Sequence, residues 1–286
     1  MARRFLLRPS DEVNRILIYL LALYASRHGV LLHAFALLST HLHLMKTDVK
    51  ADMPGFMRDL NSQTTKRMNR LLQREGSLWD ARKYGNVEVH GEHAAWDKLV
   101  YVMTNPVKHA WVEEPAEWPG LLTTVEDFRR GKVVVERPDL ECFKGSTLPK
   151  RVQLELVPPP ALAHLPREEF LAELERRVSE RVAELRAGLR QPQRSCLGRR
   201  VVLQASREGR LQRPLERSDV APRISRLDED PDRCAELIRE LQARRTAHAE
   251  ARGPWRQGEH AVVFPQGTYA YRVLHGTRSA GADPPG

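Results

Sequence analysis

The sequence predicts an α+β protein with an antiparallel sheet, because helical and strand patterns alternate irregularly over its first hundred residues. In chain order, the patterns are helix at 11–28, strand at 30–38, strand at 41–47, helix at 54–75, strand at 86–90 and helix at 94–104. Two consecutive strands joined by a short turn are typical of an antiparallel hairpin. Beyond residue 118 the later patterns are mainly helical.

The first helix has clear end signals. Ser10 is a suitable N-cap, Asp11 and Glu12 favour the first turn, and Gly29 suits the position just past the end. The stretch available for an opening strand before this helix, residues 3–7, is short.

The two strands that follow the first helix differ in pattern. Residues 30–38 form an almost unbroken apolar run, and Ser39-Thr40 is a turn signal. The second strand alternates, so His41, His43 and Met45 share one face.

Two further helices carry end signals of their own. In the 54–75 helix, apolar residues recur at helical spacing, and Gly76 ends it. Pro106 stops the 94–104 helix, because proline disfavours helical backbone at the residue before it.

The second half reads as a linker and a helical extension. Val157-Pro158-Pro159-Pro160 is typical of a stiff linker, an apolar stripe runs along 167–190, a further helix is expected at 231–251, and residues 262–273 suggest a closing hairpin. We therefore divide the chain into a domain at 1–120, a linker at 121–160 and a basic, mainly helical extension at 161–286.

Composition limits the class of protein. The 286 residues are 41% hydrophobic and 29% charged, which is enough apolar content for a core, and the net charge of +9 suits a polyanionic partner. Cys142, Cys196 and Cys234 are too far apart for a CxxC metal or redox motif. The apolar run 16–25 is too short to span a bilayer. We expect a cytoplasmic protein that does not bind membranes.

The histidine pair is the sharpest local feature. Two imidazoles at positions i and i+2 of a strand point the same way and can reach one divalent ion. Tyr101 and Asn105 are four residues apart, so a helix places both on one face. A phenol is a poor nucleophile at neutral pH, so it must be aimed at an electrophile that a metal has already polarised. Taken alone, the histidine pair is equally consistent with a structural role, and Tyr101 without the histidines is better explained as a half-buried aromatic residue on an amphipathic helix.

Three segments in this order resemble single-tyrosine HUH transposases, especially the REP-associated tyrosine transposases and their insertion-sequence relatives. They are LSTHLHL at 38–44, LWD at 78–80 and YVMTNPVK at 101–108, and the resemblance covers roughly residues 1–120. It implies a ferredoxin-like antiparallel sheet with helices on one face. It also implies cleavage and rejoining of single-stranded DNA, often beside a DNA hairpin.

The resemblance implies a role for each site residue. His41, His43 and Asn105 would bind Mg²⁺ or Mn²⁺, and Tyr101 would attack the scissile phosphorus to leave a 5′-phosphotyrosine. Thr40 stands where the family usually has Asn. Relatives have a further strand before the segment that resembles residues 4–9, so we expect either an N-terminally truncated member or one in which residues 3–7 supply a shortened substitute.

The extension is expected to contact DNA phosphates. Residues 177–217 hold 11 arginines against four glutamates, and basic side chains position DNA without reading its sequence. The segments 197–200 and 264–269 are similar to C-terminal extensions of larger transposase-like proteins. The expected DNA contacts are Lys108, Arg199, Arg200 and Arg207, in a monomer or homodimer.

Two other functions remain open at this point. One is a non-catalytic DNA-binding relative that keeps the basic surface. The other is a metal hydrolase unrelated to DNA, which is disfavoured because no carboxylate base stands at a recognisable spacing from the histidine pair.

Overall fold

The computed structural model describes residues 4–79, 85–190, 195–209, 223–224, 231–266, 271–272 and 275–280. Within these ranges the chain is a mixture of helices and small two-stranded sheets, which agrees with the predicted α+β class. No helix in the described ranges is long and apolar enough to cross a membrane. These ranges leave out several residues named above. They are Asp80 of the LWD segment, Arg194 and 210–217 of the basic stretch, and 267–270, which include the end of the 264–269 motif.

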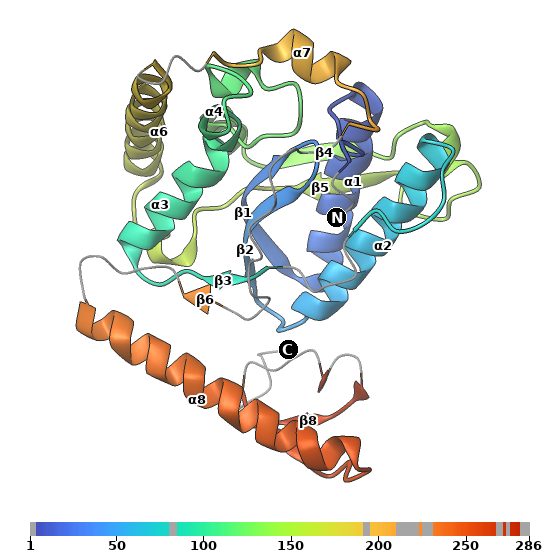
Figure 1. Cartoon of the computed structure of the whole chain (residues 1–286), viewed down its shortest axis with the longest axis vertical. Helices are drawn as coiled ribbons and strands as arrows, with labels where there is room; N and C mark the ends of the chain where they lie inside the picture. Colours follow the sequence, from blue (N-terminus) through green and yellow to red (C-terminus); the bar gives the residue numbers. More distant parts are fainter. Residues whose placement is uncertain are drawn as a thin grey trace.

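The first six elements follow in the predicted order (Figure 1). They are α1 (Asp11–His28), β1 (Val30–Leu37), β2 (Leu42–Asp48), α2 (Met53–Leu71), β3 (Val87–Glu88) and α3 (Glu92–Met103). Ser10 caps α1 by accepting a hydrogen bond from the Val13 N–H, and Gly29 ends it in the left-handed region at φ 64°.

The β1–β2 hairpin is antiparallel and contains a bulge at His33. His33 is buried, with its ring nitrogens 2.9 Å from the Val157 carbonyl oxygen and 2.8 Å from Thr47 Oγ1. Beyond the bulge, Ala36 lies opposite His43. A small residue there leaves room above the imidazole on its face of the sheet.

The two edges of the hairpin differ. The outer edge of β1 is covered by later chain, since the Leu37 N–H donates to the Leu121 carbonyl (2.8 Å) and the Val157 N–H to the Leu32 carbonyl (3.0 Å). Among the described strands, none pairs with the outer edge of β2. The larger single sheet that we predicted is therefore not seen, because β3 pairs in parallel with β6 (Arg223–Ile224) instead.

Residues 4–7, the described part of the stretch available for an opening strand, do not form one. Arg4 makes only an isolated bridge, and the chain turns at Leu6 and Leu7, whose side chains are buried in the core. The Leu7 N–H donates to the Ser39 carbonyl (3.0 Å), so this segment supports the turn of the hairpin instead of extending the sheet.

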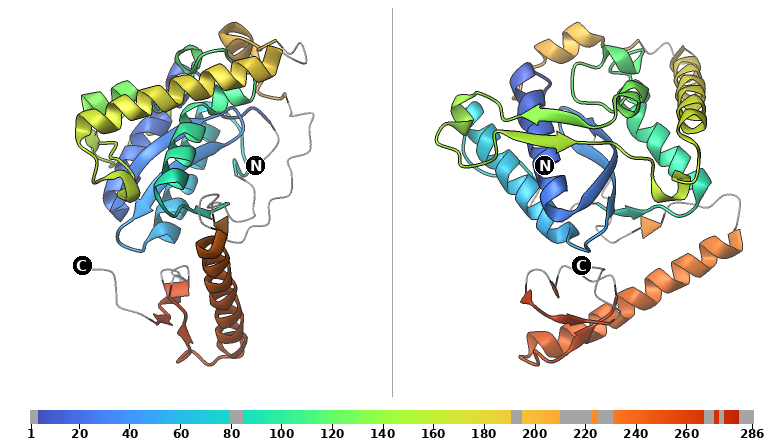
Figure 2. Two further views of the ribbon diagram at one scale, coloured as in Figure 1. Left: turned by 90° about the vertical axis from the view of Figure 1, so that its left-hand side faces the viewer. Right: turned by 180° about the vertical axis from the view of Figure 1, so that it is seen from behind.

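Helices cover both sides of the hairpin. α1 and α2 lie on one side, and α3 lies on the other with the later helix α6 (Arg167–Arg190) beside it (Figures 1 and 2). The prediction of helices on one face is therefore wrong. The second layer of helices was not predicted, because the apolar pattern of residues 94–104 does not indicate which face of the sheet this helix covers.

The expected linker is folded. It carries α5 (Val125–Arg130), β4 (Val133–Glu136) and β5 (Arg151–Leu154), and short helices precede it at α4 (Asn105–Lys108) and η1 (Pro115–Glu117). Two more 3₁₀ turns, η2 (Glu141–Phe143) and η3 (Pro160–Leu162), complete this part. Phe128, Cys142 and Phe143 are buried in the main core, so the segment packs as part of the fold.

The extension is largely helical. Besides α6, it contains α7 (Arg199–Gln204) and α8 (Pro231–Arg256), and α6 buries Phe170 and Leu174 in the main core. The hairpin expected at 262–273 is wrong, because β7 (Val263–Phe264) pairs in parallel with β8 (Arg278–Ser279).

Lys46 of β2 offers a test of the packing of this strand. Burial lowers the pKa of its ammonium to about 8, and nearby Asp48 offsets this only partly. The unfolded chain keeps that proton up to the ordinary lysine pKa of 10.5, so the free energy of unfolding rises with pH between about 8 and 10.5. Lys46→Met should therefore raise the free energy of unfolding near neutral pH by about 2 kcal/mol and flatten that rise.

Urea unfolding over this pH range measures both effects, with the exposed Lys150→Met as the matched control that leaves them unchanged. A less stable Lys46→Met protein with an unaltered pH slope would contradict the buried placement of this ammonium.

Candidate functional site

The two histidines of β2 come together as the strand pattern predicts. Their Nε2 atoms lie 2.9 Å apart, and their ring planes are nearly perpendicular. Two cis ligands of an octahedral ion, each about 2.1 Å from it, are separated by roughly 3 Å. Thr40 Oγ1 lies 2.8 Å from His41 Nδ1, which orients this ring and leaves its Nε2 directed at the partner imidazole.

The environment keeps both imidazoles neutral. Burial lowers the pKa of His41 to about 4 and that of His43 to about 3. Proximity of His109, and of His41 to His43, lowers these pKa values further in the same direction. A neutral imidazole has a free ring nitrogen that can bind a metal. The sequence did not predict that His109 lies close to the histidine pair, because the turn between α3 and α4 is what brings this residue back toward the pair.

Tyr101 of α3 lies against this pair. Its ring meets His43 edge to face, with centroids 5.6 Å apart and an interplanar angle of 88°. The Lys108 Nζ lies 4.5 Å from the centroid of the Tyr101 ring. Burial, reinforced by the nearby cations Arg181 and Lys98, lowers the pKa of Lys108. A nucleophile candidate, a metal-ligand pair and a cation therefore meet at one place.

Asn105 is fully buried at the start of α4, where Pro106 follows it. Neither its side-chain oxygen nor its side-chain nitrogen has a hydrogen-bond partner in the described part of the chain. Buried polar groups are almost always hydrogen-bonded, so this amide is left for a partner that the described residues do not supply, such as a water molecule or a bound ion. Two neutral imidazoles and one free amide oxygen fit the nitrogen and oxygen ligand set of a divalent cation. The described residues hold no cluster of three or more His, Cys, Asp or Glu side chains, so the fit depends on this amide.

The other predicted DNA contacts are divided between two positions. Arg199 and Arg200 are exposed on α7, which docks beside α4 because Val202 packs with Val107. Arg207 instead donates from Nη1 to the Leu6 carbonyl (3.1 Å), and its burial lowers its pKa. Its guanidinium therefore holds the N-terminal segment in place.

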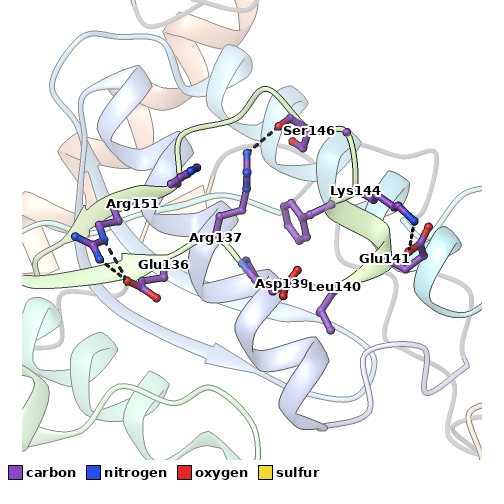
Figure 3. A pocket seen from close by; sticks show the side chains of 12 residues that line it. Glu136, Arg137, Asp139, Leu140, Glu141, Lys144, Ser146 and Arg151 are labelled. Atoms are coloured by element: carbon purple, nitrogen blue, oxygen red, sulfur yellow. Dashed lines mark hydrogen bonds and ion pairs between the residues drawn. The ribbon is translucent and has the colours of Figure 1, made fainter.

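One pocket in the described residues is lined by none of the predicted site residues (Figure 3). It has a volume of about 830 Å³ and lies between the β4–β5 pair and η2. Its two arginines are engaged within the fold: Arg137 donates to the Ser146 carbonyl (2.8 Å), and Arg151 pairs with Glu136 (3.1 Å). We therefore do not regard it as the functional site.

Comparisons with family models, with curated proteins and with solved structures found no match for this chain. The functional assignment rests on the motifs and on the geometry at Tyr101 and the histidine pair.

The orphaned amide leads to a stability prediction. Asn105→Leu should raise the free energy of unfolding of the metal-free protein by about 1 kcal/mol, because it replaces two unpaired buried polar atoms with apolar ones. Urea unfolding in EDTA measures the change. Asn69→Leu is the control, since the Asn69 side chain donates to the Gly76 carbonyl (2.8 Å) and its loss brings no gain. Destabilisation of Asn105→Leu beyond that of the control would show that the amide is already satisfied.

Proposed function

We propose that this protein is a metal-dependent tyrosine transposase of the HUH type, which cleaves and rejoins single-stranded DNA. The observation that carries the proposal is the contact of the Tyr101 ring with His43, whose Nε2 lies 2.9 Å from that of His41. In the same proposal the protein acts as a monomer or homodimer in the cytoplasm. The order α1, β1, β2, α2, β3, α3 supports a ferredoxin-like ancestry of the domain.

The reaction needs a nucleophile aimed at phosphorus. Tyr101 Oη forms a bond to the scissile phosphorus while the P–O3′ bond breaks, and the phenol proton ends on the departing 3′ oxygen. The products are a 5′-phosphotyrosine and a free 3′-OH. Because the phosphate ester bond is exchanged and not hydrolysed, the 3′-OH of another strand can reverse the step without ATP.

The remaining side chains support this step. His41, His43 and Asn105 would hold Mg²⁺ or Mn²⁺, which when bound supplies a positive charge that polarises the phosphate. Lys108, above the Tyr101 ring, is placed to neutralise a non-bridging phosphate oxygen. Arg199 and Arg200 on α7 would contact the DNA backbone further from the reacting bond.

A second candidate is a non-catalytic DNA-binding relative. The observation that favours it is the outer edge of β2, which has no strand neighbour among the described residues. The strand that carries both histidines is therefore less supported than a strand inside a larger sheet. The experiment on Tyr101 below separates the two candidates.

The central prediction concerns Tyr101. Wild-type protein incubated with end-labelled single-stranded hairpin DNA and Mn²⁺ should form a covalent adduct on a denaturing gel. Tyr101→Phe should form none, yet its DNA affinity should stay within about twofold, since only the nucleophilic oxygen is lost. Loss of affinity together with the adduct would indicate a structural tyrosine. Strong, salt-dependent binding by wild type without any adduct would favour the non-catalytic relative.

The histidine pair has its own test in the same assay. His41→Ala should abolish adduct formation, as should EDTA with the wild-type protein, because both remove the metal. His33→Ala is a matched control, since His33 is buried on β1 and bonded within the fold. Undiminished cleavage by His41→Ala would exclude the metal-binding role.

A further inference from the structure

A cleft lies between α3 and α6, and Tyr101 is part of its wall. Its volume is about 370 Å³. The other lining residues are Trp96, Asp97, Lys98, Val100, Arg177, Glu180, Arg181 and Glu184. Tyr101 therefore borders the histidine pair and this cleft at once, so a molecule in the cleft is adjacent to the nucleophile.

Cations gather at the end of the cleft near Tyr101. Lys98 comes from α3, Arg181 from α6, and Lys108 from α4 above the Tyr101 ring. They are close enough that Arg181 and Lys98 help to lower the pKa of Lys108, after burial. Three like charges held near one another destabilise the empty site, and an anion between them relieves the repulsion.

Two of the three carboxylates that line the cleft have partners outside it. Glu180 is bonded to Arg176 (2.6 Å) and Asp97 lies 3.6 Å from His93, both outside the lining. In the described part of the chain, Lys98 and Lys108 make no salt bridge. Glu184, the third carboxylate of the lining, is exposed and pairs with Arg181 itself.

Arg181 is held by a weak pair. Its Nη1 donates to Glu184 at 2.8 Å, but both side chains are well exposed, and exposed pairs contribute little stability. A phosphate can replace this carboxylate as the partner of the Arg181 guanidinium, because it can accept two charge-assisted hydrogen bonds. Arg177, by contrast, is bonded to Glu173 (2.5 Å) and packed on the Trp96 ring, so it forms the wall of the cleft.

We propose that the α3–α6 cleft binds the sugar-phosphate backbone of the single strand next to the scissile phosphate, with Lys98 and Arg181 contacting its phosphates. This inference rests on the proposed function and gives α6 a role in the site. A space of about 370 Å³ lies within the range of small-molecule sites and is sufficient for a nucleotide unit. Lys98 and Arg181 lie on α3 and α6 and are therefore separate from Arg199 and Arg200 on α7.

The test measures binding separately from chemistry. The full chain in EDTA is titrated with a fluorescent 20-nucleotide oligo-dT at several salt concentrations. Lys98→Gln with Arg181→Gln should weaken binding about tenfold and reduce the slope of log affinity against log salt by about 1.4, because two phosphate contacts are lost. The control is Arg129→Gln with Lys132→Gln, which removes the same charge outside the cleft and should have little effect.

Each outcome is decisive for the cleft. Equal affinity of the cleft and control variants overturns the inference, even if wild type forms the Tyr101 adduct and the proposed function stands. Weaker binding by the cleft variant alone supports the inference, even if no adduct forms and the tyrosine chemistry fails. Arg181→Lys keeps the charge and should retain most of the affinity, and thermal unfolding of every variant identifies any that is misfolded.

Discussion

The packing of α3 against the β1–β2 hairpin is the constraint on which the site depends. Strand alternation sends His41 and His43 to one face of β2, and the small Ala36 opposite His43 leaves that face open. α3 lies on this side of the hairpin and brings the ring of Tyr101 onto His43. If α3 were rotated about its axis by one residue, about 100°, the tyrosine would leave the imidazole pair. The main core, shared by α1, the hairpin and α3, therefore fixes the geometry of the reacting groups.

The site carries features that reduce the stability of the folded chain. The Asn105 amide is buried with no hydrogen-bond partner among the described residues, which is unfavourable, and burial keeps the two imidazoles neutral, with their Nε2 atoms within hydrogen-bond distance of each other. The cations near Tyr101 repel one another, since, after burial, Arg181 and Lys98 help to lower the pKa of Lys108, and this is offset at Arg181 by its exposed pair with Glu184. These three features share one explanation, because a cation bound by the first set and a phosphate bound by the second would neutralise each other. A purely structural role would require each feature to be explained separately.

The sequence predicted what depends on local pattern. The caps of α1 at Ser10 and Gly29, the alternation of β2 and the helical face of α6 follow from neighbouring residues, and the structure confirms these elements. The sequence could not predict which segments distant in the chain pair with one another. β3 pairs with β6, segments near residues 121 and 157 cover β1, and the supposed linker is folded into the core. At the site, strand spacing predicted that His41 and His43 share a face, and Tyr101 was singled out through the resemblance, whereas the approach of His109 and α6 depends on tertiary packing.

The extension is attached by apolar contacts next to the site, and this explains how basic residues distant in sequence could serve one reaction. Phe170 of α6 stacks on Trp96 of α3 with ring centroids 5.4 Å apart, one turn or so from Tyr101 along the same helix. Val202 of α7 packs on Val107, the neighbour of Lys108. Because both helices are anchored by buried side chains, their arginines are held at fixed distances from the tyrosine. Helices joined by a flexible linker would give the same net charge but no such placement, so the folded connection at 121–160 is what the proposed role of the extension requires.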